Sequence, residues 1–173
     1  MKKLLSVLVV SLLLIGCSEN RVLIDELTNK GTKESPLMYS EKGLFNGVGF
    51  DIYTNGQLKY EGNWKGGKRD KFHKDWYKNG QLEKEGNYKD GDSDGLHKGW
   101  YENGQLRYED ENELTDGKRD GLYKEWDPNG QLKSESNWKD GEQDGLQKSW
   151  YENGQLRFEG NYKNGMLDGE HKQ

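Results

Sequence analysis

The sequence predicts an all-β fold: one elongated domain built as an antiparallel meander of stacked β-hairpin repeats. Three observations predict it: a recurring tetrapeptide, an alternation of residue types with period two, and turn sequences between the alternating segments. The tetrapeptide Asn-Gly-Gln-Leu begins at Asn55, Asn79, Asn103, Asn129 and Asn153. A nearly fixed spacing of about 24 residues is typical of proteins that stack similar units of supersecondary structure.

The alternation within each unit predicts strands. In the segment 57–65, one face of the expected strand receives Leu58, Tyr60, Gly62 and Trp64. The period of two is that of a strand, since successive side chains point to opposite faces. Between units lies Asn-Gly, a strong hairpin signal because both residues tolerate positive φ. Each unit is therefore expected to form a hairpin, joined to the next by another tight turn.

Rows of equivalent side chains are predicted to form the core. One row is leucine, a second is aromatic, a third is tryptophan and a fourth is small, leaving room for neighbouring rings. The rows are Leu58, Leu82, Leu106, Leu132 and Leu156; Trp64, Tyr88, Leu114, Trp138 and Tyr162; Trp76, Trp100, Trp126 and Trp150; and Gly62, Gly86, Asp110, Ser136 and Gly160. In the second strand of a unit, Leu96, Lys98 and Trp100 are expected to share the core face.

Composition limits the classes of partner. Of the 173 residues, 30% are hydrophobic and 33% are charged, which alone would favour disorder, but six Trp and ten Tyr at repeat positions supply buried area. The net charge of −5 gives no attraction to nucleic acid, so no nucleic-acid partner is expected.

The N-terminus predicts a lipid anchor. Lys2 and Lys3 precede an apolar run that is too short to span a bilayer but suits a secretory signal. The run ends in Leu-Ile-Gly-Cys17, which resembles a bacterial lipobox, with Cys17 the only cysteine. The resemblance implies a signal peptide over 1–16, lipid attachment (palmitate included) at Cys17, and a mature protein held in the bacterial envelope, at the outer membrane rather than the inner. An ordinary signal with an incidental cysteine is the alternative.

Residues 17–37 are then expected to be a polar linker, and residues 38–173 to hold the repeats. The Asn-Gly-Gln-Leu turn, Glu61-Gly62-Asn63-Trp64 and the segment from Asp94-Gly95 to Trp100-Tyr101, with their counterparts, resemble the MORN repeat in its short bacterial variant, as found in proteins labelled YwqK-family antitoxins. The resemblance implies an elongated β-sheet that scaffolds proteins or membranes, and no chemistry.

Apparent metal sites are explained by the repeat. Residues 90–95 resemble the start of a calcium loop, but Tyr101 occupies the position of the required glutamate. His73, His97 and His171 share one repeat slot, expected on a solvated face and too far apart for zinc. No metal, cofactor or catalytic residue is predicted, because each carboxylate pair recurs whereas an active site is normally singular.

A row of tyrosines and two irregular aspartates form the predicted binding surface. The row is Tyr53, Tyr77, Tyr101 and Tyr151, and Asp127 interrupts it. These rings could bind a protein, peptide or glycan, or each could pack over its own Asn-Gly turn. Asp110 replaces a glycine in the same unit, which also has two extra residues between Glu109 and Gly117, where a bulge is expected.

The leading hypothesis from the sequence is a lipid-anchored, non-catalytic envelope protein that acts as a protein-binding scaffold. The alternatives are a module that binds cell-wall glycan through the aromatic rows, and an envelope immunity protein resembling an antitoxin. The predicted partners are the membrane, through the lipid, and another protein. Exposed end strands would also permit end-to-end self-association.

Overall fold

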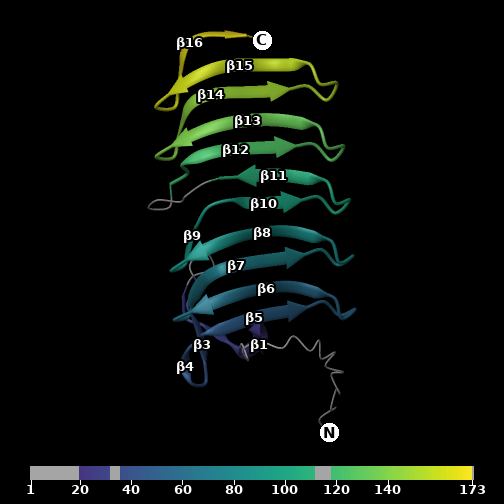
Figure 1. The fold of residues 1–173 in the computed structure, drawn as a ribbon, viewed down its shortest axis with the longest axis vertical. Coiled ribbons are helices and arrows are strands. Elements are labelled where there is room, and N and C mark those ends of the chain that lie inside the picture. Colours follow the sequence, from purple (N-terminus) through teal and green to yellow (C-terminus); the bar gives the residue numbers. More distant parts are fainter. Residues whose placement is uncertain (1–19, 32–35, 112–117, 173) are drawn as a thin grey trace.

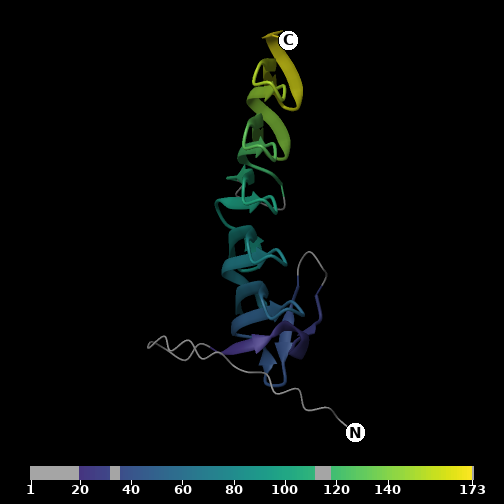
Figure 2. The ribbon, with the colours of Figure 1, turned by 90° about the vertical axis from the view of Figure 1, so that its right-hand side faces the viewer.

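The structure, a computed structural model, describes residues 20–31, 36–111 and 118–172. In this part of the chain a 13-stranded sheet forms an elongated body, with strands stacked one above another (Figures 1 and 2). From β5 onward the strands lie in sequence order, so the predicted meander is confirmed. The strands of this sheet are β1 (Arg21–Leu23), β5 (Gly47–Ile52), β6 (Leu58–Lys65), β7 (Lys68–Trp76), β8 (Leu82–Lys89), β9 (Asp92–Ser93), β10 (His97–Trp100), β11 (Leu106–Asp110), β12 (Gly121–Trp126), β13 (Leu132–Lys139), β14 (Glu142–Trp150), β15 (Leu156–Lys163) and β16 (Met166–Lys172).

The first strands form a base that differs from the predicted linker. β1 pairs with β5 in parallel, and a short 3₁₀ helix, η1 (Ile24–Glu26), follows it. A second sheet contains β2 (Thr28–Asn29), β3 (Met38–Ser40) and β4 (Gly43–Leu44). Part of the segment 17–37 is thus folded, because its apolar residues Val22, Ile24 and Leu27 pack against a buried cluster. The cluster consists of Met38, Phe45 and Trp64.

The Asn-Gly-Gln-Leu segments form the tight turns that join units. In the first, the Tyr53 amide donates to the Gln57 carbonyl at 2.8 Å, and Gly56 has φ 83°. The Asn55 side chain fixes the turn by accepting from the Gln57 amide at 3.2 Å. The same contacts recur in the later units, and the Gln57 amide group lies against Gly80 of the next turn. Identical turns therefore stack on one side of the sheet.

Each of these turns is followed by a one-residue shift of register. The shift lies between Asp75 and Trp76 in β7, so that Trp76 comes opposite Leu82. Equivalent shifts place Trp100 opposite Leu106, Trp126 opposite Leu132 and Trp150 opposite Leu156. The shift behaves as a β-bulge, which re-aims the side chains on one side of it. The tryptophan and leucine rows consequently pack side by side.

The register corrects two predictions about the second strand of each unit. His73 lies opposite Gly62 and Gly86, on the face that also carries Tyr60 and Trp64, and is 5% exposed. Leu96 is 41% exposed, and Lys98 lies on the opposite face of the sheet, facing Glu85 and Glu109. Counting alternate residues backward from the tryptophan assigns Leu96 and Lys98 to the wrong face, because the bulge lies next to the tryptophan and interrupts the alternation. The face with Tyr60 and His73 is called the histidine face below.

The other face carries an alternating ladder of charges. Consecutive strands from β6 to β16 place glutamate and lysine directly opposite each other, in the order Glu61, Lys74, Glu85, Lys98, Glu109, Lys124, Glu135, Lys148, Glu159 and Lys172. Ion pairs form within it, such as Lys98–Glu109 at 2.7 Å and Lys148–Glu159 at 3.1 Å. Opposite charges in cross-strand pairs stabilise a sheet while keeping its face soluble. This surface is called the ladder face.

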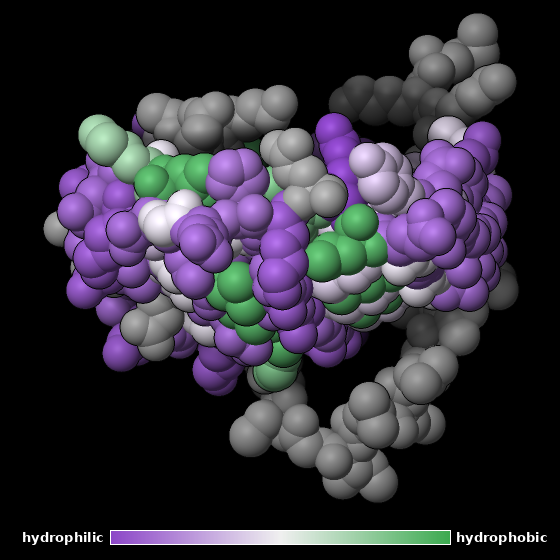
Figure 3. Space-filling view, turned by 90° about the horizontal axis from the view of Figure 1, so that it is seen from above, coloured by the Kyte–Doolittle hydropathy of each residue, from purple (hydrophilic) through white to green (hydrophobic). Residues whose placement is uncertain are grey.

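The C-terminal end of the body exposes hydrophobic side chains. Figure 3 looks down on this end, where hydrophobic groups lie among hydrophilic ones. Met166 is 76% exposed and Leu167 is 42% exposed, both on β16. Within the described residues, none of the helical segments has the length and apolar character to cross a lipid bilayer. The predictions for the signal peptide and Cys17, and for the insertion over 112–117 with Leu114, fall outside the described residues.

Candidate functional site

The tyrosine row links consecutive units. The Tyr53 hydroxyl donates to the Trp76 carbonyl at 2.8 Å, Tyr77 to the Trp100 carbonyl at 2.7 Å, and Tyr101 to the Trp126 carbonyl at 2.8 Å. These three rings are half-buried against the next turn. Their hydroxyl groups are thus occupied by the repeat itself. Tyr151 differs: it is 53% exposed, and its hydroxyl has no hydrogen-bond partner in the described part of the chain.

Asp127 interrupts this link between the fourth and fifth units. It holds the turn as the tyrosines do, since its amide donates to the Gln131 carbonyl at 2.8 Å. The aspartate side chain, however, is shorter than tyrosine and has no donor when ionised, so it cannot bond the Trp150 carbonyl as a phenol does. A cavity of about 350 Å³ opens beside it, lined by Asp127, Lys133, Ser134, Ser149, Trp150, Tyr151, Glu152 and Arg157.

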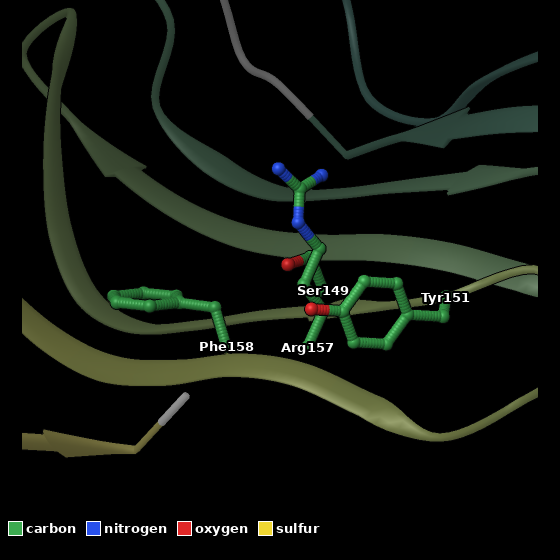
Figure 4. Close-up of a pocket in the computed structure, with 4 residues that line it drawn as sticks. All are labelled: Ser149, Tyr151, Arg157 and Phe158. Atoms are coloured by element: carbon green, nitrogen blue, oxygen red, sulfur yellow. The ribbon is translucent and has the colours of Figure 1, made fainter.

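A second cavity, of about 470 Å³, adjoins the first and shares three of its residues. Ser149, Tyr151, Arg157 and Phe158 line it (Figure 4). The two cavities together are called the terminal hollow. Its floor is a row of cross-strand neighbours, since Ser134 lies opposite Ser149 and Ser149 opposite Phe158. Ser134 takes the position that Tyr60 and Tyr108 hold in earlier units, and its smaller side chain deepens the surface here.

Arg157 reaches the hollow because of the bulge. The register shifts between Ser149 and Trp150, and Arg157 is the extra residue on β15, between Leu156 and Phe158. Its guanidinium carbon lies 6.0 Å from the centre of the Tyr151 ring, within reach of a cation–π interaction. Arg107 and Tyr101 form the same pair at 6.0 Å two units earlier. The arrangement therefore belongs to the repeat, whereas the exposed phenol and the hollow belong to the last units.

A chain of rings on the histidine face forms a second, more buried cluster. His73 packs edge-on against Trp64 at 5.4 Å and Tyr88 at 4.9 Å, and Tyr88 packs against His97 at 5.1 Å. His73 Nε2 donates to the Asn63 carbonyl at 2.7 Å, so its Nδ1 accepts from the Tyr60 hydroxyl at 2.6 Å. Burial lowers the pKa of His73 to about 4 and raises the pKa of Tyr60.

Both His73 nitrogens are bonded, and the ring is covered. The imidazole lies directly over a glycine: a Cβ on Gly62 would stand 2.3 Å from His73 Nδ1. Gly86 holds His97 in the same way, at 2.2 Å. For Gly62 and Gly86, the prediction that this row makes room for rings is confirmed. A cavity of about 270 Å³ lies alongside, bordered by Arg69, Asp75 and Lys84 among others, and burial raises the pKa of Asp75.

The predicted surface residues lie in separate places. Asp127 and Tyr151 line the same hollow. Asp110 lies in β11 and contacts Arg119 at 3.3 Å, and Arg119 in turn covers the Tyr123 and Trp138 rings at 4.7 and 5.2 Å. Tyr53, Tyr77 and Tyr101 lie along the turns of earlier units. Cys17 is outside the described residues.

Sequence reasoning missed Ser149, Arg157 and Phe158. Each has repeat equivalents, so none looks unusual, and only the pairing of strands brings them beside Asp127 and Tyr151. The signal in the sequence is the small Ser134, where other units have a larger residue, in the same unit as the loss of tyrosine at position 127. The apparent calcium loop is a turn, with Asp90 at φ 52° and Gly91 at φ 103°. Across the described ranges, no group of three His, Cys, Asp or Glu side chains could hold a metal ion.

The fold and the repeated turns define a class: a solenoid-like repeat protein built from stacked β-hairpins. Residues 45–65, 73–90, 93–111, 119–140 and 143–164 match the MORN repeat variant, and the chain belongs to this family. Repeats of this kind are found in proteins that bind membranes or other proteins. Among curated proteins, none is significantly similar to this chain.

Proposed function

We propose that the protein is a lipid-anchored scaffold of the bacterial envelope that binds another protein at the terminal hollow and performs no catalysis. The observation behind the proposal is the contrast between this hollow and the rest of the array. Elsewhere the tyrosine hydroxyls bond the next unit, and the charges of the ladder face oppose one another. At the hollow, Arg157 and Tyr151 are exposed together, and neither the guanidinium nor the phenol hydroxyl has a hydrogen-bond or ion-pair partner within the described residues.

The composition of the hollow suits a protein partner. Tyrosine, tryptophan and arginine are the side chains most enriched in the energetically important centres of protein interfaces. Tyr151, Trp150 and Arg157 meet here, with serine hydroxyls at the floor. The surrounding sheet is rigid because each strand is bonded to both neighbours through most of the body. A rigid surface loses little entropy when it binds.

The histidines support a non-catalytic role. His73 is buried, its nitrogens are both bonded, and its pKa is far below neutrality, so it does not offer a free base to a substrate. His97 Nε2 is likewise within hydrogen-bonding distance of the Asn87 carbonyl and the Ser93 hydroxyl, at 2.9 and 2.5 Å. Both residues hold neighbouring strands together.

The anchor follows from Cys17 in its lipobox-like context. Growth with a labelled fatty acid should label the wild-type protein, while the Cys17→Ser variant should remain unlabelled and leave the membrane fraction. Equal labelling of both proteins would contradict lipid attachment at this residue. Separation of the two envelope membranes would then test the outer-membrane location.

Partner binding is tested by cross-linking intact envelopes and purifying the wild-type protein beside two variants. Arg157→Gln alters the hollow, and Arg107→Gln alters the equivalent pair of an earlier unit, so it serves as a matched control. A protein recovered with the wild type and with Arg107→Gln, but lost with Arg157→Gln, supports the proposal. Recovery of a glycan in place of a protein would favour the alternative of wall binding; the half-buried state of Trp76, Trp100, Trp126 and Trp150 does not favour it.

A further inference from the structure

We propose that the terminal hollow receives an acidic side chain from an extended segment of the partner protein. This inference rests on the proposed function, because it assumes that the hollow is the protein-binding surface. It adds the chemistry of recognition: one carboxylate, held by the Arg157 guanidinium in a cavity that Ser149, Tyr151 and Phe158 also line.

The hydrogen-bond donors of the hollow point to an anionic group. Arg157, Ser149, Tyr151 and Phe158 line one cavity, and in Figure 4 the Arg157 guanidinium extends past Ser149 and away from the Tyr151 hydroxyl, with the Phe158 ring to one side. The guanidinium group offers two parallel N–H donors that match the two oxygens of a carboxylate. Hydroxyl donors can complete the shell of such an oxygen. Among the four residues that line this cavity, Arg157 supplies the only charge.

Comparison with the earlier Arg–Tyr pair shows which groups remain available to a ligand. Arg107 lies over the Tyr101 ring at the same 6.0 Å, but the Tyr101 hydroxyl donates to the Trp126 carbonyl. In that earlier unit Gly99 lies opposite Tyr108, and the Tyr108 ring covers the glycine. A Cβ on Gly99 would stand 2.2 Å from the ring. At the hollow, Ser149 replaces the glycine and Phe158 replaces Tyr108, and the cavity stays open.

The shape of the hollow suits an extended peptide. Its floor crosses β13, β14 and β15 through Ser134, Ser149 and Phe158, which are cross-strand neighbours. Three strands span roughly 10 Å, and an extended chain covers that distance with about three residues. Arg157 precedes Phe158 on β15, so an acidic side chain at Arg157 leaves the rest of the segment over Ser149 and Ser134.

The rim of the hollow excludes densely anionic surfaces. Asp127 and Glu152 line the smaller cavity together with Arg157 and with Lys133, whose charge is paired with Glu125 at 2.8 Å. Two carboxylates would repel an anionic bilayer or a phosphate dianion, but they accommodate a single carboxylate whose chain neighbour is basic. The observations thus favour a peptide over a membrane lipid headgroup.

Calorimetric titration of the full chain in detergent tests this inference. The probes are the peptides Ac-Thr-Val-Glu-Val-Lys-Thr-NH₂ and its Glu→Gln analogue, inorganic phosphate, and vesicles that contain phosphatidylglycerol. We expect the acidic peptide to bind at least tenfold more tightly than the Gln analogue. Arg157→Gln should abolish this preference, whereas Arg107→Gln should preserve it.

Equal binding of both peptides, or a preference that survives Arg157→Gln, would overturn the inference. Stronger binding of phosphate or vesicles, lost in Arg157→Gln, would also overturn it and identify a different anion. The proposed function is judged separately, by the envelope cross-linking above. The two tests can also give different answers: cross-linking captures a partner only when Arg157 is intact, while the titration shows no preference for the acidic peptide. That pair of results would support the proposed function and contradict carboxylate recognition.

Discussion

His73 illustrates how a single residue can be buried without disrupting a thin sheet. Its ring rests on Gly62, its two nitrogens bond the Asn63 carbonyl and the Tyr60 hydroxyl, and Trp64 and Tyr88 cover its edges. A charged imidazole would lose the bond from Tyr60, because a protonated Nδ1 can no longer accept. Burial therefore lowers the pKa of His73 to about 4 from an ordinary value of 6.5.

The stability of the protein should depend on pH through this residue. Since the folded pKa lies below the unfolded one, the unfolded chain binds more protons between these values, and stability falls as pH drops from 6.5 toward 4. The His73 contribution amounts to about 3 kcal/mol, fully present above pH 6.5. Urea unfolding of wild type and His73→Gln at pH 7.5 and pH 4.5 measures it.

Gln147 makes His73→Gln an apt reference, because it occupies the same slot in a later unit and donates to the Asn137 carbonyl at 2.9 Å. The difference between the two proteins should shrink or reverse at the lower pH. Asp75, whose pKa is raised by burial, acts in the opposite direction and is common to both proteins. A difference that does not change with pH would show that His73 does not titrate as described.

The glycine beneath this ring should be intolerant of any side chain. A Cβ at Gly62 would lie 2.2 Å from the Tyr60 hydroxyl and 2.3 Å from His73 Nδ1. Gly62→Ala should cost about 2–3 kcal/mol of unfolding free energy, as overpacking of a filled site does. Gly160→Ala is the milder control, since its closest atoms, Phe158 Cζ and Leu167 Cδ1 at 2.8 and 2.9 Å, are the movable ends of side chains. Equal losses in the two variants would contradict the packing described.

At the scale of the elements, the hairpins and turns could be predicted from the sequence, and the facing of the second strands could not. Asn-Gly turns and period-two segments specify local structure directly. The bulge after Leu82 depends on how β7 and β8 pair, which is a tertiary property. Position 83 and its equivalents are all charged, a feature that indicates exposure and does not by itself indicate a bulge. As a result, simple alternation predicts the histidine slot on the solvated face, although it lies opposite the glycine row.

The hydrogen bonds of the tyrosine row should stabilise neighbouring units. Tyr77→Phe leaves the ring in place and removes the donor to the Trp100 carbonyl, at an expected cost of about 1 kcal/mol in unfolding free energy. Tyr151→Phe makes the same chemical change where the hydroxyl has no partner within the described residues, and it should alter stability by less than about 0.5 kcal/mol. Chemical denaturation of both variants distinguishes the bonded from the exposed phenol; the expectation fails if Tyr151→Phe costs as much.

At the scale of the whole molecule, the ladder face gives the sheet a periodic charge pattern. Reversing one charge in the ladder should create repulsion with the oppositely placed residues on both neighbouring strands. Lys98→Glu would place three glutamates in a row across β8, β10 and β11, and should destabilise the protein by about 1–2 kcal/mol at low salt. The loss should decrease in about 0.5 M salt because these groups are partly exposed to solvent.

Lys65→Glu is the matched reversal for this prediction. Lys65 lies opposite Lys68 at the β6–β7 turn, so the change replaces a like-charge pair with an opposite-charge pair. It should leave stability unchanged or slightly increased. A loss in Lys65→Glu similar to that in Lys98→Glu would mean that the ladder contributes no specific pairing.

The terminal hollow marks the limit of prediction from this sequence. Asp127 stands out because it interrupts the tyrosine row. Arg157 and Ser149 do not stand out, because other units have comparable residues at the equivalent positions. Their proximity to Asp127 depends on the register of three strands. Conversely, comparison of the repeats correctly predicts that the calcium-like loop is a turn, since this segment forms one of the recurring turns.

Site-specific photo-cross-linking in intact cells tests the central claim most directly, namely that the hollow is the surface at which this scaffold binds another protein. A photoreactive benzoylphenylalanine would replace Tyr151 at the hollow or, as the control, Phe72, which is 56% exposed on the ladder face. A discrete protein adduct is expected from position 151 and none from position 72. Adducts of the same protein from both positions, or from position 72 alone, would contradict it.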